Sequence, residues 1–193
     1  MDLPTFTFLA VVVGVVNGRA LFRTLEVYAE MIQEGRAQRF AERWLFDSWL
    51  LFQTMLHLLL WWSIWDAHAL RLDFVRYLFL MIGPVTLFLA TSVLTPPGPL
   101  RGGDALEHFL RVRERFGYIS AMTWVWAVLY VPILHGRWDR EIAFTAALAV
   151  VMLAVASFRG VRLQRVLALG AWVVLIWLIV TFAVLVGPTP AAA

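Results

Sequence analysis

The chain has 193 residues, of which 62% are hydrophobic and only 15% carry a charge, and its mean hydropathy is +0.78. A soluble domain of this length carries more charge and breaks its apolar runs more often, so the composition favours one transmembrane helical domain over residues 1–193. The absence of cysteine excludes disulfides and thiol chemistry, and the net charge of +3 does not indicate nucleic-acid binding, because the arginines lie at predicted helix ends.

Six apolar runs are candidates for membrane spans, each of which needs about 20 helical residues to cross the hydrocarbon. We therefore expect an all-α membrane protein, a bundle of about six transmembrane helices. The fifth run is short, and the sixth is long enough to tilt. The expected spans are Phe6–Leu25, Trp44–Trp65, Phe74–Leu94, Phe116–Leu134, Ile142–Phe158 and Leu163–Val186.

The arginines predict an orientation. Twelve of the 16 basic residues, all arginine, lie in or beside the segments that join spans 1–2, 3–4 and 5–6, and four lie on the opposite side. Positive residues in short loops stay cytoplasmic, so we expect both termini on the non-cytoplasmic side. The four on that side are Arg71, Arg76, Arg137 and Arg140.

The first span carries a polar residue within the membrane and charges at its cytoplasmic end. Asn17 lies inside a GxxxG pattern (residues 14–18), which lets a second helix approach, either span two or a second copy of the chain. Arg19, Arg23 and Glu26 share one helical face. They indicate a charged vestibule, or a helix that leaves the bilayer with its arginines snorkelling.

The second span is the richest in polar side chains, which lie on or beside one helical face: Arg43, Asp47, Gln53, Thr54 and His57. A carboxylate at the depth of Asp47 is costly unless paired, so we expect Arg43, or an arginine of the first helix, as its partner. His57 and Gln53 lie near the middle of the bilayer. The histidine is a candidate proton relay, ion or substrate contact or haem ligand, or a neutral imidazole bonded to a neighbouring helix.

The third span is interrupted by Gly83 and Pro84 near its middle. Proline removes a backbone donor and clashes with the preceding turn, so a kink is expected. The carbonyls it frees, near Leu80 or Met81, are candidate ion ligands, although kinks are also ordinary in membrane helices. The break that follows this span, residues 95–104, is too rich in proline and glycine for regular structure.

No pattern indicates catalysis or a cofactor. An intramembrane enzyme needs a nucleophile and base or a carboxylate dyad, and only a lone aspartate and a lone histidine are available within the spans. No short-spaced ligand pair predicts zinc, and the other histidines lie near the interfaces, which disfavours haem. We therefore expect no catalytic residues, no metal and no cofactor.

Three stretches carry a resemblance: Leu60-Trp-Trp-Ser-Ile-Trp65, Phe79-Leu-Met-Ile-Gly-Pro84 with the Thr95-Pro-Pro break, and the Arg111-x-Arg-x-Arg-Phe116 entry to span four. Over roughly residues 44–118 the chain resembles a group of small, uncharacterised, polytopic inner-membrane proteins of bacteria. The resemblance implies a helical membrane fold in the inner (plasma) membrane and brings no assigned activity.

Two functions remain as hypotheses. The first is a small transporter or channel, with a polar file (Asn17, Gln53, Thr54, His57 and Pro84) between helices 1, 2 and 3. Its gate would be a charged cytoplasmic cluster (Arg19, Arg23, Glu26, Arg43 and Asp47). The second is a structural or accessory subunit of a membrane complex. If the residues of the polar file line one water-accessible cavity, transport is favoured. If each of them is hydrogen-bonded to an adjacent helix in a dry core, the structural role is favoured. The expected partners are the lipid bilayer and either further copies of the chain or a larger membrane complex.

Overall fold

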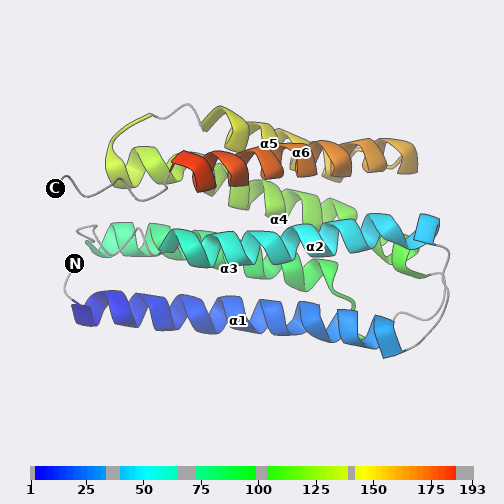
Figure 1. Cartoon of the computed structure of the whole chain (residues 1–193), viewed down its shortest axis with the longest axis horizontal. Coiled ribbons are helices and arrows are strands. Elements are labelled where there is room, and N and C mark those ends of the chain that lie inside the picture. Colours follow the sequence, from blue (N-terminus) through cyan, green and yellow to red (C-terminus); the bar gives the residue numbers. More distant parts are fainter. Residues whose placement is uncertain (1–2, 34–39, 65–72, 99–103, 139–141, 186–193) are drawn as a thin grey trace.

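The computed structural model describes residues 3–33, 40–64, 73–98, 104–138 and 142–185, and every regular element in these ranges is a helix (Figure 1). The all-α fold class predicted from the sequence is confirmed. The helices are α1 (Leu3–Gln33), α2 (Phe40–Ile64), α3 (Phe74–Leu94), α4 (Asp104–His135), α5 (Ile142–Ser157) and α6 (Val161–Leu185).

Four helices are long and apolar enough to cross a membrane, namely α1, α3, α4 and α6, and α5 is a shorter apolar helix. The protein therefore has the helices of a membrane-embedded chain, while the number of six spans and the side of the termini stay predictions. Among the described helices, α2 is long but too polar to be counted with these four, since Asp47, Gln53 and His57 interrupt its apolar sequence.

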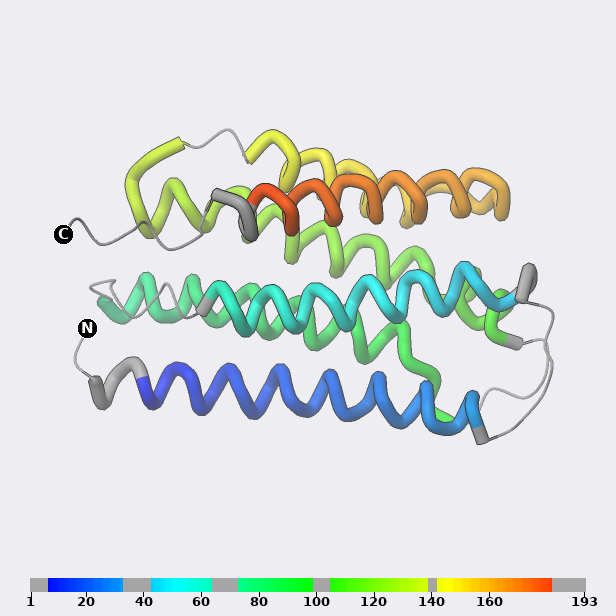
Figure 2. Tube along the Cα trace, in the orientation of Figure 1, coloured from blue at the N-terminus to red at the C-terminus, as the bar shows by residue number. Residues whose placement is uncertain are grey.

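The polar side chains of α2 are accommodated by contacts with other helices. This helix packs against α1, α3, α4 and α6, so that its polar residues Gln53 and His57 face the interior, while Leu51, Leu58 and Trp62 on its other face are exposed. The helices run side by side along the long axis, with α1 at one edge and α5 and α6 at the other (Figures 1 and 2). The start of α1 and the end of α6 lie at the same end of the bundle. The ends of α1, α3 and α5 and the starts of α2, α4 and α6 lie at the opposite end.

Two helices, α1 and α4, extend well beyond the predicted spans. The first helix continues past Leu25 to Gln33, as its charged face suggested. The amphipathic stretch predicted over residues 105–115 and the fourth span form one continuous helix, α4. By contrast, α3 has the predicted bounds and begins after a capping residue, Asp73, whose carboxylate accepts a hydrogen bond from the backbone N–H of Arg76 (2.8 Å).

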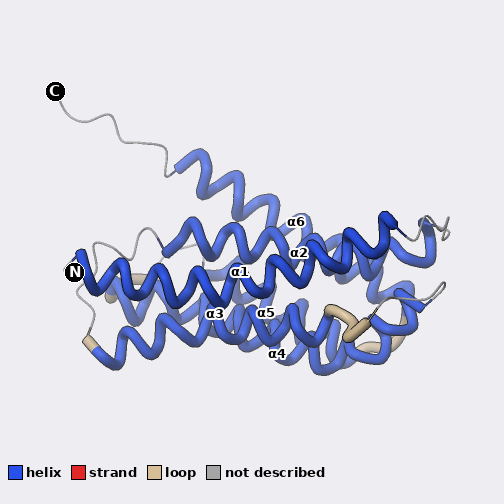
Figure 3. The backbone as a smooth tube through the Cα atoms, turned by 90° about the horizontal axis from the view of Figure 1, so that it is seen from below, coloured by secondary structure: helices blue, strands red, loops and turns tan. Residues whose placement is uncertain are grey.

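Aromatic side chains fill the centre of the bundle where α2 meets α4. The ring of Trp49 packs edge-on against Phe52 and Phe116 and parallel to Phe109, and all four side chains are buried. Trp172 of α6 packs edge-on against Phe52 and donates to the Ser48 hydroxyl at 2.8 Å, which fixes α6 to α2. Beyond this contact α6 is inclined to the other helices, and its C-terminal end lies away from them (Figure 3).

Candidate functional site

Polar side chains from four helices meet in the interior. His57 and Gln53 lie one turn apart on α2, and Asn17 reaches them from α1. Thr91 of α3 and Ser120 of α4 complete the group, which we call the polar network (Asn17, Gln53, His57, Thr91 and Ser120). No member exposes more than 3% of its surface. Three of the five residues of the predicted polar file are therefore brought together, and two hydroxyl residues that the sequence did not single out join them.

Asn17 binds His57 at two points. Its side-chain Nδ2 donates to the backbone carbonyl of His57 at 3.0 Å, and its Oδ1 lies against the imidazole Nδ1 in a short hydrogen bond. A carbonyl oxygen only accepts, so the first bond fixes which side of the amide faces the ring. Because Oδ1 also only accepts, the imidazole Nδ1 carries the proton in this pair.

The other side of the ring binds α3. The imidazole Nε2 lies 2.9 Å from the Thr91 hydroxyl. In a neutral imidazole with its proton on Nδ1, Nε2 is an acceptor, so Thr91 donates to it. Because the single hydroxyl proton of Thr91 is used by His57, the 3.5 Å separation from Gln53 Oε1 is a contact and not a second hydrogen bond. Gln53 Nε2 donates to the Ser120 hydroxyl at 3.4 Å, a long and therefore weaker bond. Both nitrogens of His57 are satisfied by neighbouring helices.

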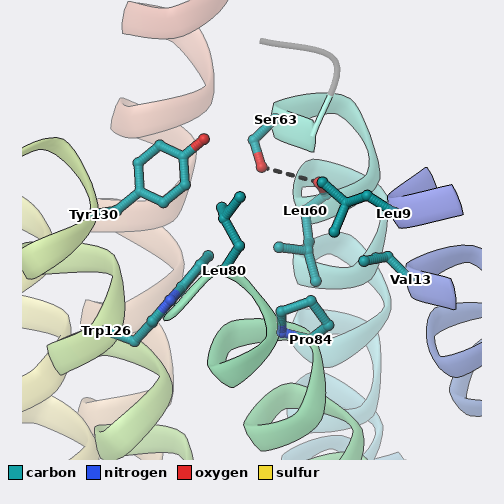
Figure 4. A pocket seen from close by; sticks show the side chains of 8 residues that line it. All are labelled: Leu9, Val13, Leu60, Ser63, Leu80, Pro84, Trp126 and Tyr130. Atoms are coloured by element: carbon teal, nitrogen blue, oxygen red, sulfur yellow. Dashed lines mark hydrogen bonds between the residues drawn. The ribbon is translucent and has the colours of Figure 1, made fainter. Parts of the chain in front are cut away.

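The remaining two file residues do not join the network. The Thr54 hydroxyl donates to the carbonyl of Leu50 in its own helix at 2.9 Å, the ordinary arrangement for threonine in a helix. Pro84 lies toward the end of the bundle where α1 begins, beside a small apolar pocket (Figure 4). The pocket is lined by Leu9, Val13, Leu60, Ser63, Leu80, Pro84, Trp126 and Tyr130.

A tryptophan of α4 covers the proline region of α3. The indole Nε1 of Trp126 donates to the Phe79 carbonyl at 2.7 Å, one residue before the carbonyl that Pro84 leaves without its helical donor. A Cβ atom at Gly83 would lie 2.5 Å from the Trp126 ring, so the glycine is what allows the indole to lie flat against the helix. An aromatic side chain, rather than open space, therefore lies against this stretch of α3.

The predicted charged cytoplasmic cluster forms two separate ion pairs. Arg23 binds Glu26 at 3.1 Å and also donates to the carbonyl of Pro96, which ties α1 to the end of α3. Arg43 binds Asp47 at 2.8 Å within α2, so the predicted partner in the same helix is the one observed. Arg19 is exposed and, among the described residues, forms no ion pair with Asp47. The second oxygen of Asp47 is buried without a hydrogen-bond partner in the described part of the chain.

The polar network provides hydrogen bonds that join α1, α2 and α3. In the ranges that the structure describes, no group of three His, Asp or Glu side chains is placed to hold a metal ion. We compared the chain with family models, with curated proteins and with solved structures, and none of the three comparisons gave a match.

Proposed function

We propose that the chain is a structural or accessory component of a membrane, whose interior polar residues hold its helices in register, and not a carrier with an aqueous path. The observation behind this proposal is the polar network, in which Asn17, His57 and Thr91 satisfy one another in a buried interior. A transport path needs polar groups that face water or exchange partners with a substrate.

The surroundings of the network support the same proposal. Toward one end, the apolar pocket is lined by seven side chains without a charge and by Ser63, whose hydroxyl donates to its own helix at Leu60. Toward the other end, Trp49 and its aromatic neighbours Phe52, Phe109 and Phe116 fill the space between α2 and α4. Polar groups that bond across helices in such an interior stabilise the arrangement of the helices.

The test is ion flux in liposomes. Purified protein is reconstituted into vesicles that contain a pH-sensitive dye, and proton entry is recorded under an imposed potential. We expect the wild type, His57→Ala and protein-free vesicles to show the same rate. A flux that the wild type supports and His57→Ala abolishes would overturn the proposal in favour of transport. Comparison of Thr91→Val with Thr54→Val by protein unfolding gives the structural role a positive test of its own.

A further inference from the structure

Three arginines lie in or against the turn from α5 into α6. The turn consists of Phe158, Arg159 and Gly160, and its first carbonyl, that of Phe158, accepts hydrogen bonds from two helices. Arg113 of α4 donates to it through Nε at 3.2 Å, and Gln164 of α6 through Nε2 at 2.6 Å. Arg113 is thereby held next to Arg159. Arg162 follows three residues later, in the first turn of α6. We call this group the arginine corner (Arg113, Arg159 and Arg162).

The positive charge of the corner has no anionic partner in the described part of the chain. Arg113 is only 7% exposed, yet the acceptors of its Nε and Nη1 atoms are the neutral carbonyls of Phe158 and Leu110. The ion pairs of the described residues join other arginines: Arg23 to Glu26, Arg43 to Asp47, Arg76 to Asp73 and Arg111 to Glu107.

The sequence of α5, the turn and α6 contains no carboxylate that could pair with these arginines. From Ile142 to Ala193 there is neither aspartate nor glutamate. On α4, the exposed Glu114 follows Arg113 directly but forms no ion pair with it. A cation that is mostly removed from water is costly without a counter-charge, so the corner is suited to an anion from outside the chain.

The place of the corner in the bundle identifies the source of that anion. From Arg113 to His135, α4 covers 22 residue steps, about 33 Å at 1.5 Å per residue, which is close to the thickness of the hydrocarbon layer. The corner therefore lies where hydrocarbon gives way to head groups. Directly beside it, Phe158 and Val166 are 51% and 63% exposed, apolar surface of the kind that acyl chains cover.

We propose that the arginine corner binds the phosphate of an anionic phospholipid, whose acyl chains lie along the outward face of α6. The planar guanidinium of an arginine can donate two parallel hydrogen bonds to phosphate oxygens, and the side chains of Arg159 and Arg162 are exposed and so accessible to a lipid. A free phosphate ion would use the charges but not the exposed apolar surface beside them. This proposal rests on the membrane location that the proposed function assumes. It adds an anionic phospholipid as a partner of the chain.

The test measures lipid binding by native mass spectrometry of the full chain in detergent, with dioleoyl phosphatidylglycerol and dioleoyl phosphatidylcholine as probes. We expect the wild type to prefer phosphatidylglycerol. Arg159→Gln combined with Arg162→Gln should weaken that binding on the order of 25-fold, since each interfacial arginine contributes about fivefold. Arg111→Gln, which removes an exposed arginine of α4 that is paired with Glu107, should leave the affinity unchanged.

Three outcomes would overturn the proposal: equal affinity for the two lipids, unchanged binding in the double variant, or displacement of phosphatidylglycerol by millimolar inorganic phosphate. The last would assign the corner to a free anion. Flotation with phosphatidylcholine vesicles separates these failures from a failure of the proposed function. A chain that floats but shows no lipid preference lacks only the lipid site, whereas one that does not float is not a membrane component.

Discussion

The imidazole of His57 has each nitrogen bonded to a different helix, and the bonding fixes its tautomer. Asn17 presents an acceptor to Nδ1 because its amide nitrogen is used by the His57 carbonyl, and Thr91 presents a hydroxyl to Nε2. We predict that nitrogen-15 NMR of the ring shows a protonated Nδ1 and an unprotonated Nε2. Asn17→Ala removes the acceptor and should abolish this preference. A proton found on Nε2 in the wild type would contradict the assignment.

The contribution of the network to stability can be measured by a matched pair of threonine substitutions. Thr91→Val removes the hydroxyl that bonds His57 across helices, whereas Thr54→Val removes one that bonds only the Leu50 carbonyl of its own helix. We expect the free energy of unfolding to fall by about 1 kcal/mol for Thr91→Val, because an interhelical bond is lost and a buried nitrogen is left unpaired.

For Thr54→Val, the change should stay within about 0.5 kcal/mol. Unfolding of both variants by a denaturing detergent, followed by tryptophan fluorescence, provides the comparison. Equal losses in the two would show that the interhelical bonds add nothing beyond helix formation, and the polar network would lose its structural role.

At the scale of the helices, the sequence predicts the elements better than their contacts. Apolar runs mark α3, α5 and α6 nearly to the residue, since hydropathy reports which segments avoid water. It does not report which neighbours surround a helix, and so it predicts α2 only as one more membrane span, without its contacts to four other helices. These contacts depend on how the whole bundle packs.

The candidate site was predicted in the same partial way. Asn17, Gln53 and His57 stand out because amide and imidazole groups are rare in apolar helices. Thr91 and Ser120 do not, because a hydroxyl in a helix usually bonds its own backbone, as Thr24 does with the carbonyl of Ala20 at 3.0 Å. Whether a threonine hydroxyl bonds its own backbone or a neighbouring helix depends on how its helix is rotated about its axis. A single sequence does not show that rotation.

Close packing of α4 on α5 depends on one glycine. A Cβ atom at Gly117 would lie 2.7 Å from the backbone nitrogen of Ala156 and 2.8 Å from the carbonyl oxygen of Met152, and neither atom moves without shifting α5. We expect Gly117→Ala to lower the free energy of unfolding by about 1–3 kcal/mol, as overpacking does elsewhere.

Gly18 is the control for this substitution. A Cβ atom there would meet nothing within 4 Å, so Gly18→Ala should cause no loss and gains the better helix propensity of alanine, about 1 kcal/mol. Thermal unfolding in detergent distinguishes the two variants. A stable Gly117→Ala protein with unchanged midpoint would mean that α4 and α5 lie farther apart than these distances indicate.

For the whole molecule, alternating helix directions bring the ends of α1, α3 and α5 to one end of the bundle, and the arginine count predicts that this end is cytoplasmic. The chain lacks cysteine, so a single introduced cysteine reports its own side without background. Two positions at opposite ends tolerate the change. A Cβ atom at Gly98, after α3, would meet nothing within 4 Å, and Trp138, after α4, is 74% exposed.

In intact cells, we expect a membrane-impermeant maleimide to label Trp138→Cys, and to label Gly98→Cys only after the membrane is permeabilised. The expectation follows from the difference of twelve arginines against four, because moving an arginine through the hydrocarbon costs several kcal/mol and the short connections carry most of them. The reverse pattern would place both termini in the cytoplasm, and the arginine corner would then face the outer leaflet. Labelling of both variants in intact cells would mean that α4 does not cross the membrane at all.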